Sequence, residues 1–290
     1  MSRTHAKLLL ISVFIARGTS FLFSKNLLQS MQPMSILAVR FTLAFLVLAI
    51  VFFKKLRSCS RESFIGGLIL GLMYTVCMVF EMYGLRMVDT GVSSLIENMA
   101  IVLVPIYAAI LTKTMPQRKT MVCAVIAVIG VGFLSLAQNS AGGSKLGIGL
   151  IILAAMTYAG CIIVTEKVSR GADPIAIGMI QLGTMGALSL LASLALKNFS
   201  LPQTGSQWAM MLMLVLVCSC FGFAFQPVGQ KYVPAESAAV FTVVNPFTAS
   251  IMGITIAGES ISTEKMIGYV LILSALILYN THPKQKKLCQ

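Results

Sequence analysis

The sequence predicts an all-α polytopic membrane protein with about ten transmembrane helices, arranged as two inverted five-helix repeats. Three observations support this fold class. Hydrophobic residues make up 57% of the 290 residues, charged residues only 11%, and the mean hydropathy is +0.90, whereas a soluble domain carries roughly 25% charged residues. The apolar residues form continuous runs long enough to cross a bilayer as helices. The two halves of the chain also share a sequence pattern.

Charges, prolines and Gly/Ser clusters divide the apolar sequence into ten predicted spans. About 20 apolar residues cross a hydrocarbon layer roughly 30 Å thick, so the chain has room for about ten helices with short loops. A β-barrel is excluded because its strands would alternate polar and apolar residues. The predicted spans are 7–28, 33–53, 63–85, 91–112 and 120–138 in the first half, and 146–166, 173–195, 208–229, 236–257 and 265–280 in the second.

The Lys and Arg residues between the spans predict the orientation of the chain. With the N-terminus in the cytoplasm, 15 of the 22 Lys and Arg residues fall on the cytoplasmic side and 5 on the other side, as the positive-inside rule requires. The remaining two, Arg17 and Arg40, lie inside spans. The sequence therefore predicts a multi-pass protein of the cell membrane with both termini in the cytoplasm. Because these loop residues explain the net charge of +13, we expect no nucleic-acid partner.

An internal repeat divides the chain into residues 1–139 and 140–290. The segment FEMYGLRMVDTGVSSL, from Phe80, aligns with FQPVGQKYVPAESAAV, from Phe225, at an offset of 145 residues. Each half holds five predicted helices. Because five is odd, the second half must enter the membrane from the opposite side, and an inverted repeat of this kind supports alternating access.

These features resemble the drug/metabolite transporter superfamily, specifically its ten-helix EamA-type members. The resemblance covers nearly the whole chain and rests on Gly18 and Lys25, Pro33 with Arg40-Phe41, YGLRMVDTGVSSLI, and VGQKYVPAESAAVFTVVNPF followed by AGESIS. The chain departs from the family pattern where Arg17 replaces a tryptophan and Thr112-Lys113 replaces the first Gly-Glu pair. The resemblance implies a secondary transporter that exports a small polar metabolite, such as an amino acid, by alternating access.

Four charged residues inside the predicted spans are the first candidates for a transport site: Arg17, Arg40, Glu81 and Glu97. A charge near the bilayer centre costs several kcal/mol, so a charge retained there is a functional candidate. At about 1.5 Å of rise per residue, Arg17 lies roughly 15 Å deep, near the midplane. The other three lie roughly 6–10 Å below the outer ends of their helices, in one layer.

Two interpretations of these charges remain open. In the first, Arg40 pairs with Glu81 or Glu97 in a structural network, because an unpaired buried charge is costly. In the second, the arginines hold a carboxylate or phosphate group of the solute, and a glutamate exchanges protons as access alternates.

Neutral polar residues inside the spans extend the predicted transport path; they are Asn98, Tyr158, Gln181, Gln226 and Asn245. In the repeat alignment Gln181 corresponds to Arg40 and Gln226 to Glu81, so all the intramembrane charge lies in the first half. A proline inside a helix removes a backbone hydrogen bond, and we therefore predict helix breaks at Pro105, Pro227 and Pro246.

The sequence indicates no catalytic residues, no metal site and no cofactor. The cysteines lack CxxC pairing and companion histidines, because His5 and His282 lie near the chain ends. An intramembrane enzyme is the least favoured alternative, and a structural or sensing membrane protein is the other. The expected partners are a small polar solute and membrane lipid. Protons coupled through Glu81 or Glu97 are a hypothesis, and a homodimer is left open.

Overall fold

The computed structural model describes residues 1–113, 115, 118–140, 144–242, 244–259 and 262–280. All the elements in these ranges are helices, which confirms the predicted all-α class. His282 and the basic residues of the predicted cytoplasmic C-terminus lie outside the described residues.

The helices of the first half follow the predicted spans. They are α1 (Arg3–Leu27), α2 (Pro33–Val51), α3 (Phe53–Arg57), α4 (Arg61–Met87), α5 (Thr90–Glu97), α6 (Ala100–Leu111) and α7 (Arg118–Ser140). Serine caps fix two of the starts: Ser2 accepts a hydrogen bond from the His5 N–H, and Ser60 accepts one from the Ser63 N–H. Pro33 begins α2, where its missing N–H costs nothing.

The second half begins with two long helices and continues with shorter ones. The elements are α8 (Lys145–Gly171), α9 (Pro174–Ala195), α10 (Gly205–Met213), the π-helix η1 (Leu214–Phe221), α11 (Gln226–Gln230), α12 (Ala235–Phe241), α13 (Val244–Thr255) and α14 (Thr263–Asn280). Asp173 caps α9 by accepting a hydrogen bond from the Ile175 N–H. Thr204 and Gln207 form a reciprocal capping box at the start of α10.

Eight single helices or helix runs are long and apolar enough to cross a membrane. They are Arg3–Leu27, Pro33–Val51, Arg61–Met87, Thr90–Leu111, Lys145–Gly171, Pro174–Ala195, Gly205–Gln230 and Ala235–Thr255. Where the fifth span is predicted, α7 contains a shorter apolar stretch, Met121–Leu134. Where the tenth is predicted, the chain forms α14.

Three of these spans are interrupted helices. Tight i→i−3 hydrogen bonds, such as the Ile101 N–H to the Asn98 carbonyl at 3.1 Å, separate α5 from α6. Pro105 lies inside α6, so this interruption falls earlier in the chain than the proline. Pro227 and Pro246 lie in the first turns of α11 and α13, each of which continues a span after an interruption.

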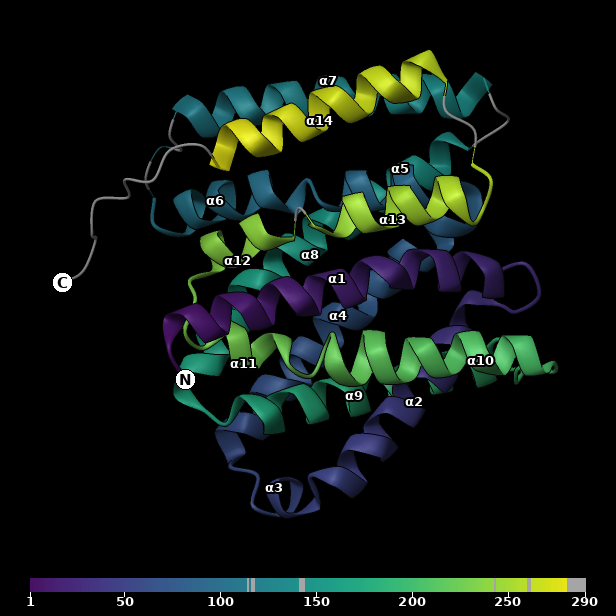
Figure 1. The fold of residues 1–290 in the computed structure, drawn as a ribbon. Helices are drawn as coiled ribbons and strands as arrows, with labels where there is room; N and C mark the ends of the chain where they lie inside the picture. The colour runs from purple at the N-terminus through teal and green to yellow at the C-terminus, as the bar shows by residue number, and fades with distance from the viewer. Residues whose placement is uncertain (114, 116–117, 141–143, 243, 260–261, 281–290) are drawn as a thin grey trace.

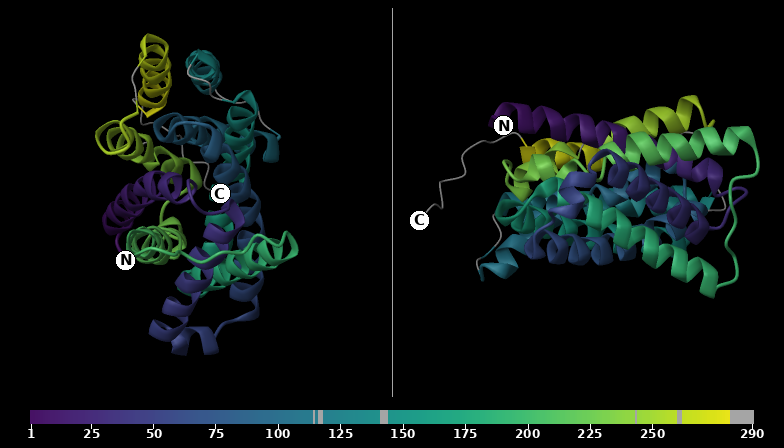
Figure 2. Two further views of the ribbon diagram at one scale, coloured as in Figure 1. Left: turned by 90° about the vertical axis from the view of Figure 1, so that its right-hand side faces the viewer. Right: turned by 90° about the horizontal axis from the view of Figure 1, so that it is seen from below.

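The helices of the two halves are interleaved. α4 packs against α8 and α9, α2 packs against α9, and α1 packs against α13 and η1. Gly67 and Gly71 allow α4 to pack closely against α9. A Cβ atom at Gly71 would collide with Thr184 of α9. α7 and α14 lie side by side along one edge of the bundle, and α3 lies at the opposite edge (Figures 1 and 2). α1 begins and α14 ends at the same end of the bundle (Figure 1).

Candidate functional site

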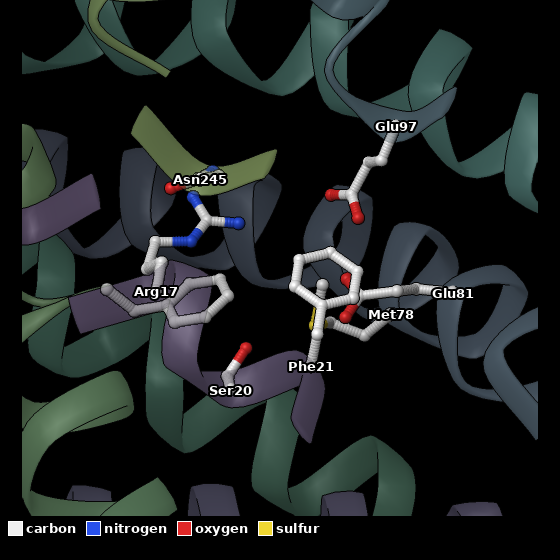
Figure 3. Close-up of a pocket in the computed structure, with 8 residues that line it drawn as sticks. Arg17, Ser20, Phe21, Met78, Glu81, Glu97 and Asn245 are labelled. Atoms are coloured by element: carbon white, nitrogen blue, oxygen red, sulfur yellow. The ribbon is translucent and has the colours of Figure 1, made fainter. Parts of the chain in front are cut away.

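A small polar cavity lies in the middle of the helical bundle. Its lining comes from both halves of the chain: Arg17, Ser20 and Phe21 of α1, Met78 and Glu81 of α4, Glu97 of α5, Phe223 between η1 and α11, and Asn245 of α13 (Figure 3). The cavity volume is about 10 Å³, which is room for about one water molecule. The bundle is therefore closed around this site, and a solute can enter only after helices move apart.

Arg17 is the best-connected charge of the cavity. Its guanidinium Nη1 donates to the Tyr158 hydroxyl at 2.9 Å and to the Gln226 Oε1 at 2.8 Å. Its Cζ lies 4.3 Å from the centre of the Phe223 ring and 4.7 Å from that of the Tyr158 ring, within the range of a cation–π interaction. Neutral dipoles and aromatic faces thus hold this cation, and no direct ion pair within the described part of the chain cancels its charge.

Arg40 is fully buried but does not line the cavity. Its Nε donates to the Ser219 hydroxyl of η1 at 2.7 Å. Its two Nη atoms have no hydrogen-bond partner among the described residues. The guanidinium carbon lies 5.0 Å from the Phe41 ring centre and 5.7 Å from that of Phe223. The Phe223 ring therefore lies against the guanidinium groups of both Arg17 and Arg40.

Glu81 and Glu97 supply the carboxyl groups of the cavity. Both are almost fully buried, and their carboxyl groups point toward one another across the cavity (Figure 3). The Glu97 Oε2 has no hydrogen-bond partner in the described part of the chain. In the same part, no ion pair of 4.0 Å or less joins Arg17 or Arg40 to these glutamates. The structural pairing of Arg40 with a glutamate is therefore not seen in this conformation.

The structure brings most of the predicted path residues together, but not all of them. Asn245 lines the cavity, and its Oδ1 is buried without a hydrogen-bond partner among the described residues. Tyr158 and Gln226 bind Arg17 directly. Asn98 lies outside the lining and donates to the Ser94 carbonyl of its own helix. Gln181 also lies outside it, buried in α9.

Two residues that complete the site were not singled out in the sequence. Phe223 stacks on both arginines, and Ser219 is the hydrogen-bond partner of Arg40. The signal that points to them is indirect: a buried arginine needs an aromatic face or a hydroxyl, and the FGFAF run with its neighbouring CSC supplies both.

Hydrogen bonds close the end of the bundle at which α1 terminates. The Lys25 Nζ donates to the Leu85 carbonyl at 2.7 Å and to the Val88 carbonyl at 2.8 Å, which joins α1 to the end of α4. The Glu259 carboxylate accepts hydrogen bonds from the Thr90 N–H at 2.6 Å and the Gly91 N–H at 3.2 Å. These contacts tie the second half of the chain to the N-terminus of α5.

At the opposite end, one charged pair joins α3 to the start of α9 and a second lies within α8. The Lys55 Nζ lies 3.0 Å from the Asp173 Oδ2, and Arg170 pairs with Glu166 one turn away. Partial burial acts to raise the pKa of Asp173, but hydrogen bonds from Lys55 and from the Ile175 N–H outweigh it and hold that pKa below its ordinary value. Asp173 is therefore ionised at neutral pH.

The described residues offer no group of three or more His, Cys, Asp or Glu side chains that could hold a metal ion. The central site instead holds groups suited to binding a solute. A cation, two carboxyl groups, and amide and carboxyl oxygens without hydrogen-bond partners among the described residues all face the small cavity. Such a site can bind a solute that carries both a negative group and hydrogen-bond donors.

Comparisons with known proteins identify the kind of membrane protein to which this site belongs. The sequence model of the EamA-like transporter family matches residues 5–136 and 145–281. A solved crystal structure covers 96% of this chain and 97% of its own, with a TM-score of 0.70 at 16% sequence identity. At that identity the likeness shows the fold alone.

Curated relatives are named as transporters without a stated substrate. The uncharacterized transporter YwfM of Bacillus subtilis (strain 168) is 22% identical over 175 residues, which cover 60% of this chain and 59% of YwfM. The chain thus spans less than two thirds of that relative. YcxC of the same strain is 24% identical over 93% of this chain and 90% of its own length. An uncharacterized transporter of Archaeoglobus fulgidus is 24% identical over 96% of this chain and 86% of its own.

Proposed function

Because the chain belongs to the EamA-like transporter family and is a multi-pass membrane protein, we propose that it is a secondary transporter that exports a small polar metabolite, such as an amino acid, by alternating access. The observation that carries the proposal is the central cavity. In a helical membrane core, it places one guanidinium opposite two carboxyl groups. A charge buried in a membrane core is costly, so a charge that is retained there is a functional candidate.

The cavity residues divide the recognition of a zwitterionic solute between them. Arg17 binds the negative group of the solute, because a guanidinium presents five donors and only its Nη1 is committed to Tyr158 and Gln226 by the hydrogen bonds described above. Glu81 and Glu97 receive the solute's ammonium group, and the free Asn245 Oδ1 accepts a further hydrogen bond. When the solute is absent, the two facing carboxyl groups exchange protons with the open side, which couples transport to a proton gradient.

The volume of the cavity agrees with alternating access. With room for about one water molecule, the site is occluded, and both ends of the bundle carry closing contacts. Opening one end at a time would expose Arg17 to each side in turn. Two inverted halves, residues 1–139 and 140–290, supply the rocking bodies, and the two stretches matched by the family model support this division. In the proposed orientation, the protein lies in the cell membrane, and the end of the bundle where α1 begins faces the cytoplasm.

Counterflow in liposomes tests this function. Purified protein is reconstituted, amino acids and organic acids are screened as trans-loaded solutes, and wild type is compared with Arg17→Gln. Each lost hydrogen bond to a charged group is worth about 1.5–3 kcal/mol, so we expect kcat/KM to fall by about 10- to 100-fold. The control is Arg86→Gln, because Arg86 is an exposed arginine that hydrogen-bonds Gln32 at the end of α4.

The coupling ion is tested separately in Glu81→Gln. An imposed proton gradient should drive the solute uphill in wild type. Glu81→Gln, which keeps Glu97 for the ammonium group, should exchange solute at equal concentrations with a raised KM and lose the uphill movement. If wild type shows no saturable counterflow of any solute, the function proposed here is wrong. If Arg17→Gln transports as well as Arg86→Gln, the central cavity is not the binding site.

A further inference from the structure

A second hollow opens at the end of the bundle where α1 begins. Its volume is about 590 Å³, and it is lined by Met1, Lys55, Arg170, Gly171, Ala172, Asp173, Pro174, Ile175, Val228, Lys231 and Tyr232. Three of these side chains are cationic and one is acidic. We refer to it as the basic cleft. Unlike the central cavity, it is large enough to admit an organic solute.

The cations of the basic cleft keep free donors. Lys231 gives one hydrogen bond, from its Nζ to the Ala172 carbonyl at 3.2 Å, although an ammonium has three donors. Arg170 pairs with Glu166, but its side chain remains 60% exposed. Lys55 pairs with Asp173 with 43% of its side chain exposed. With three cations against one carboxylate, the lining carries a net positive charge. A concave charged surface concentrates ions of the opposite sign, so this cleft attracts anions.

The short helix α11 connects the basic cleft to the hydrogen-bond partner of Arg17. Gln226, at its start, binds Arg17, whereas Val228 of α11 and Lys231 just after it line the cleft. Five residues of helix rise about 7 Å. Gln226 also begins a buried chain of hydrogen bonds along α11, from the Gln226 Nε2 to the Gln230 Oε1 at 2.9 Å, and from the Gln230 Nε2 to the Ile162 carbonyl of α8 at 3.0 Å.

The segment before α11 is irregular. The π-helix η1 leads into a turn in which the Gly222 N–H bonds the Val217 carbonyl, five residues back, at 3.1 Å. π-helical turns are rare and occur often at functional sites. α11 is thus a five-residue helix that follows a π-helical segment, and its first residue binds Arg17.

We infer that the basic cleft is the vestibule through which an oxyanion-bearing solute reaches Arg17, and that α11 is the gate between them. This inference rests on the proposed function and adds to it a route, a gate and a chemical requirement: the solute carries a carboxylate or phosphate group. A solute that reaches Arg17 competes with Gln226 for the guanidinium, and release of Gln226 frees α11 to move.

Collisional quenching tests the cleft without knowledge of the solute. Tyr232→Trp in a Trp208→Phe background places the single tryptophan in the cleft, since Trp208 is the only one in the chain. In phosphatidylcholine vesicles, with each quencher scaled to its quenching of free N-acetyltryptophanamide, we expect iodide to quench it at least threefold more strongly than caesium. Adding Lys231→Gln should remove most of this preference. Adding Asp173→Asn should increase it, because asparagine still caps α9 and only the negative charge is lost.

Sided transport measurements test the vestibule itself. Glutamate, lactate and inorganic phosphate serve as probes in oriented proteoliposomes. Lys231→Gln should raise KM from the cleft side three- to tenfold, leave KM from the other side unchanged, and weaken the salt dependence of uptake. Lys54→Gln is the control, because Lys54 is an exposed lysine of α3 outside the lining.

Each outcome separates the two proposals. Equal quenching by iodide and caesium, or an unchanged KM in Lys231→Gln, would overturn the vestibule while transport stands. Preferential iodide quenching without transport of any probe would reject the proposed function and retain the cleft as an anion site. If phosphatidylglycerol in the vesicles abolishes the iodide preference and Lys231→Gln leaves KM unchanged, a lipid headgroup occupies the cleft, and the vestibule is wrong.

Discussion

Glu259 holds the N-terminus of α5 from a position 169 residues away in the sequence. Asp89 occupies the N-cap position of α5 but makes no capping hydrogen bond, and its carboxylate instead pairs with Lys265 at 2.5 Å. The Glu259 carboxylate takes over the capping role and binds two N–H groups of the first turn, where the helix dipole also favours an anion. In Glu259→Gln, one acceptor oxygen becomes an NH₂ group that faces an N–H donor.

The expected cost follows from these contacts. One hydrogen bond is lost and the other loses its charge assistance, at about 1.5–3 kcal/mol for a bond to a charged group. A loss of about 2 kcal/mol makes local opening roughly 30-fold more frequent. Hydrogen–deuterium exchange of the peptide that contains Thr90 and Gly91 measures this opening directly. We expect exchange to accelerate by about that factor in Glu259→Gln.

The matched control is Glu264→Gln, since Glu264 is a fully exposed acidic residue in the first turn of α14. Its exchange profile should equal that of wild type at Thr90 and Gly91. If Glu259→Gln exchanges like wild type, or if both variants accelerate equally, the carboxylate does not hold α5 and the closing contact is misassigned.

Three further predictions concern the remaining charges. Arg40→Met should raise or preserve the melting temperature in detergent, because a buried cation with free donors is costlier than an apolar side chain of similar size; a lower melting temperature would contradict this. The Phe223→Leu variant should lose about 1–2 kcal/mol of stability in denaturant unfolding, since two cation–π contacts disappear, and an unchanged midpoint would refute those contacts. The pKa of Asp173 is lowered in the folded protein. Its ionised form therefore stabilises the fold fully above the unfolded-state pKa near 4, and this stabilisation is lost as the pH falls through the lower folded-state pKa. In thermal melts, Asp173→Asn should therefore lose less stability than wild type between pH 5 and pH 3.

The grouping of the charges could be predicted only in part from regular helix geometry. Counting residues places Arg17 deeper than a layer that holds Arg40, Glu81 and Glu97, whereas the cavity brings Arg17 together with Glu81 and Glu97 and leaves Arg40 outside its lining. The spans themselves followed from apolar runs of membrane-crossing length. These inferences depend only on local sequence and on the dimensions of a bilayer.

Contacts between distant segments could not be predicted in this way. Nothing near Phe223 shows that its ring will lie against Arg17, because that contact depends on how η1 packs against α1. The interruption between α5 and α6 was also missed, since Asn98 and Met99 are ordinary helix residues and the nearest proline lies inside α6. A proline indicates where a backbone hydrogen bond is absent, but tertiary packing determines where the helix is interrupted.

The order in which the chain is made adds a constraint on the two buried arginines. The partners of Arg17, Tyr158 and Gln226, follow it by 141 and 209 residues, and Ser219 follows Arg40 by 179. At about 5–20 residues per second, Gln226 is synthesised roughly 10–40 s after Arg17. During that interval each guanidinium must stay hydrated, because an unpaired charge in hydrocarbon costs several kcal/mol. We therefore expect α1 and α2 to remain reversibly inserted during biogenesis, and to settle into the membrane only when η1 and α11 arrive.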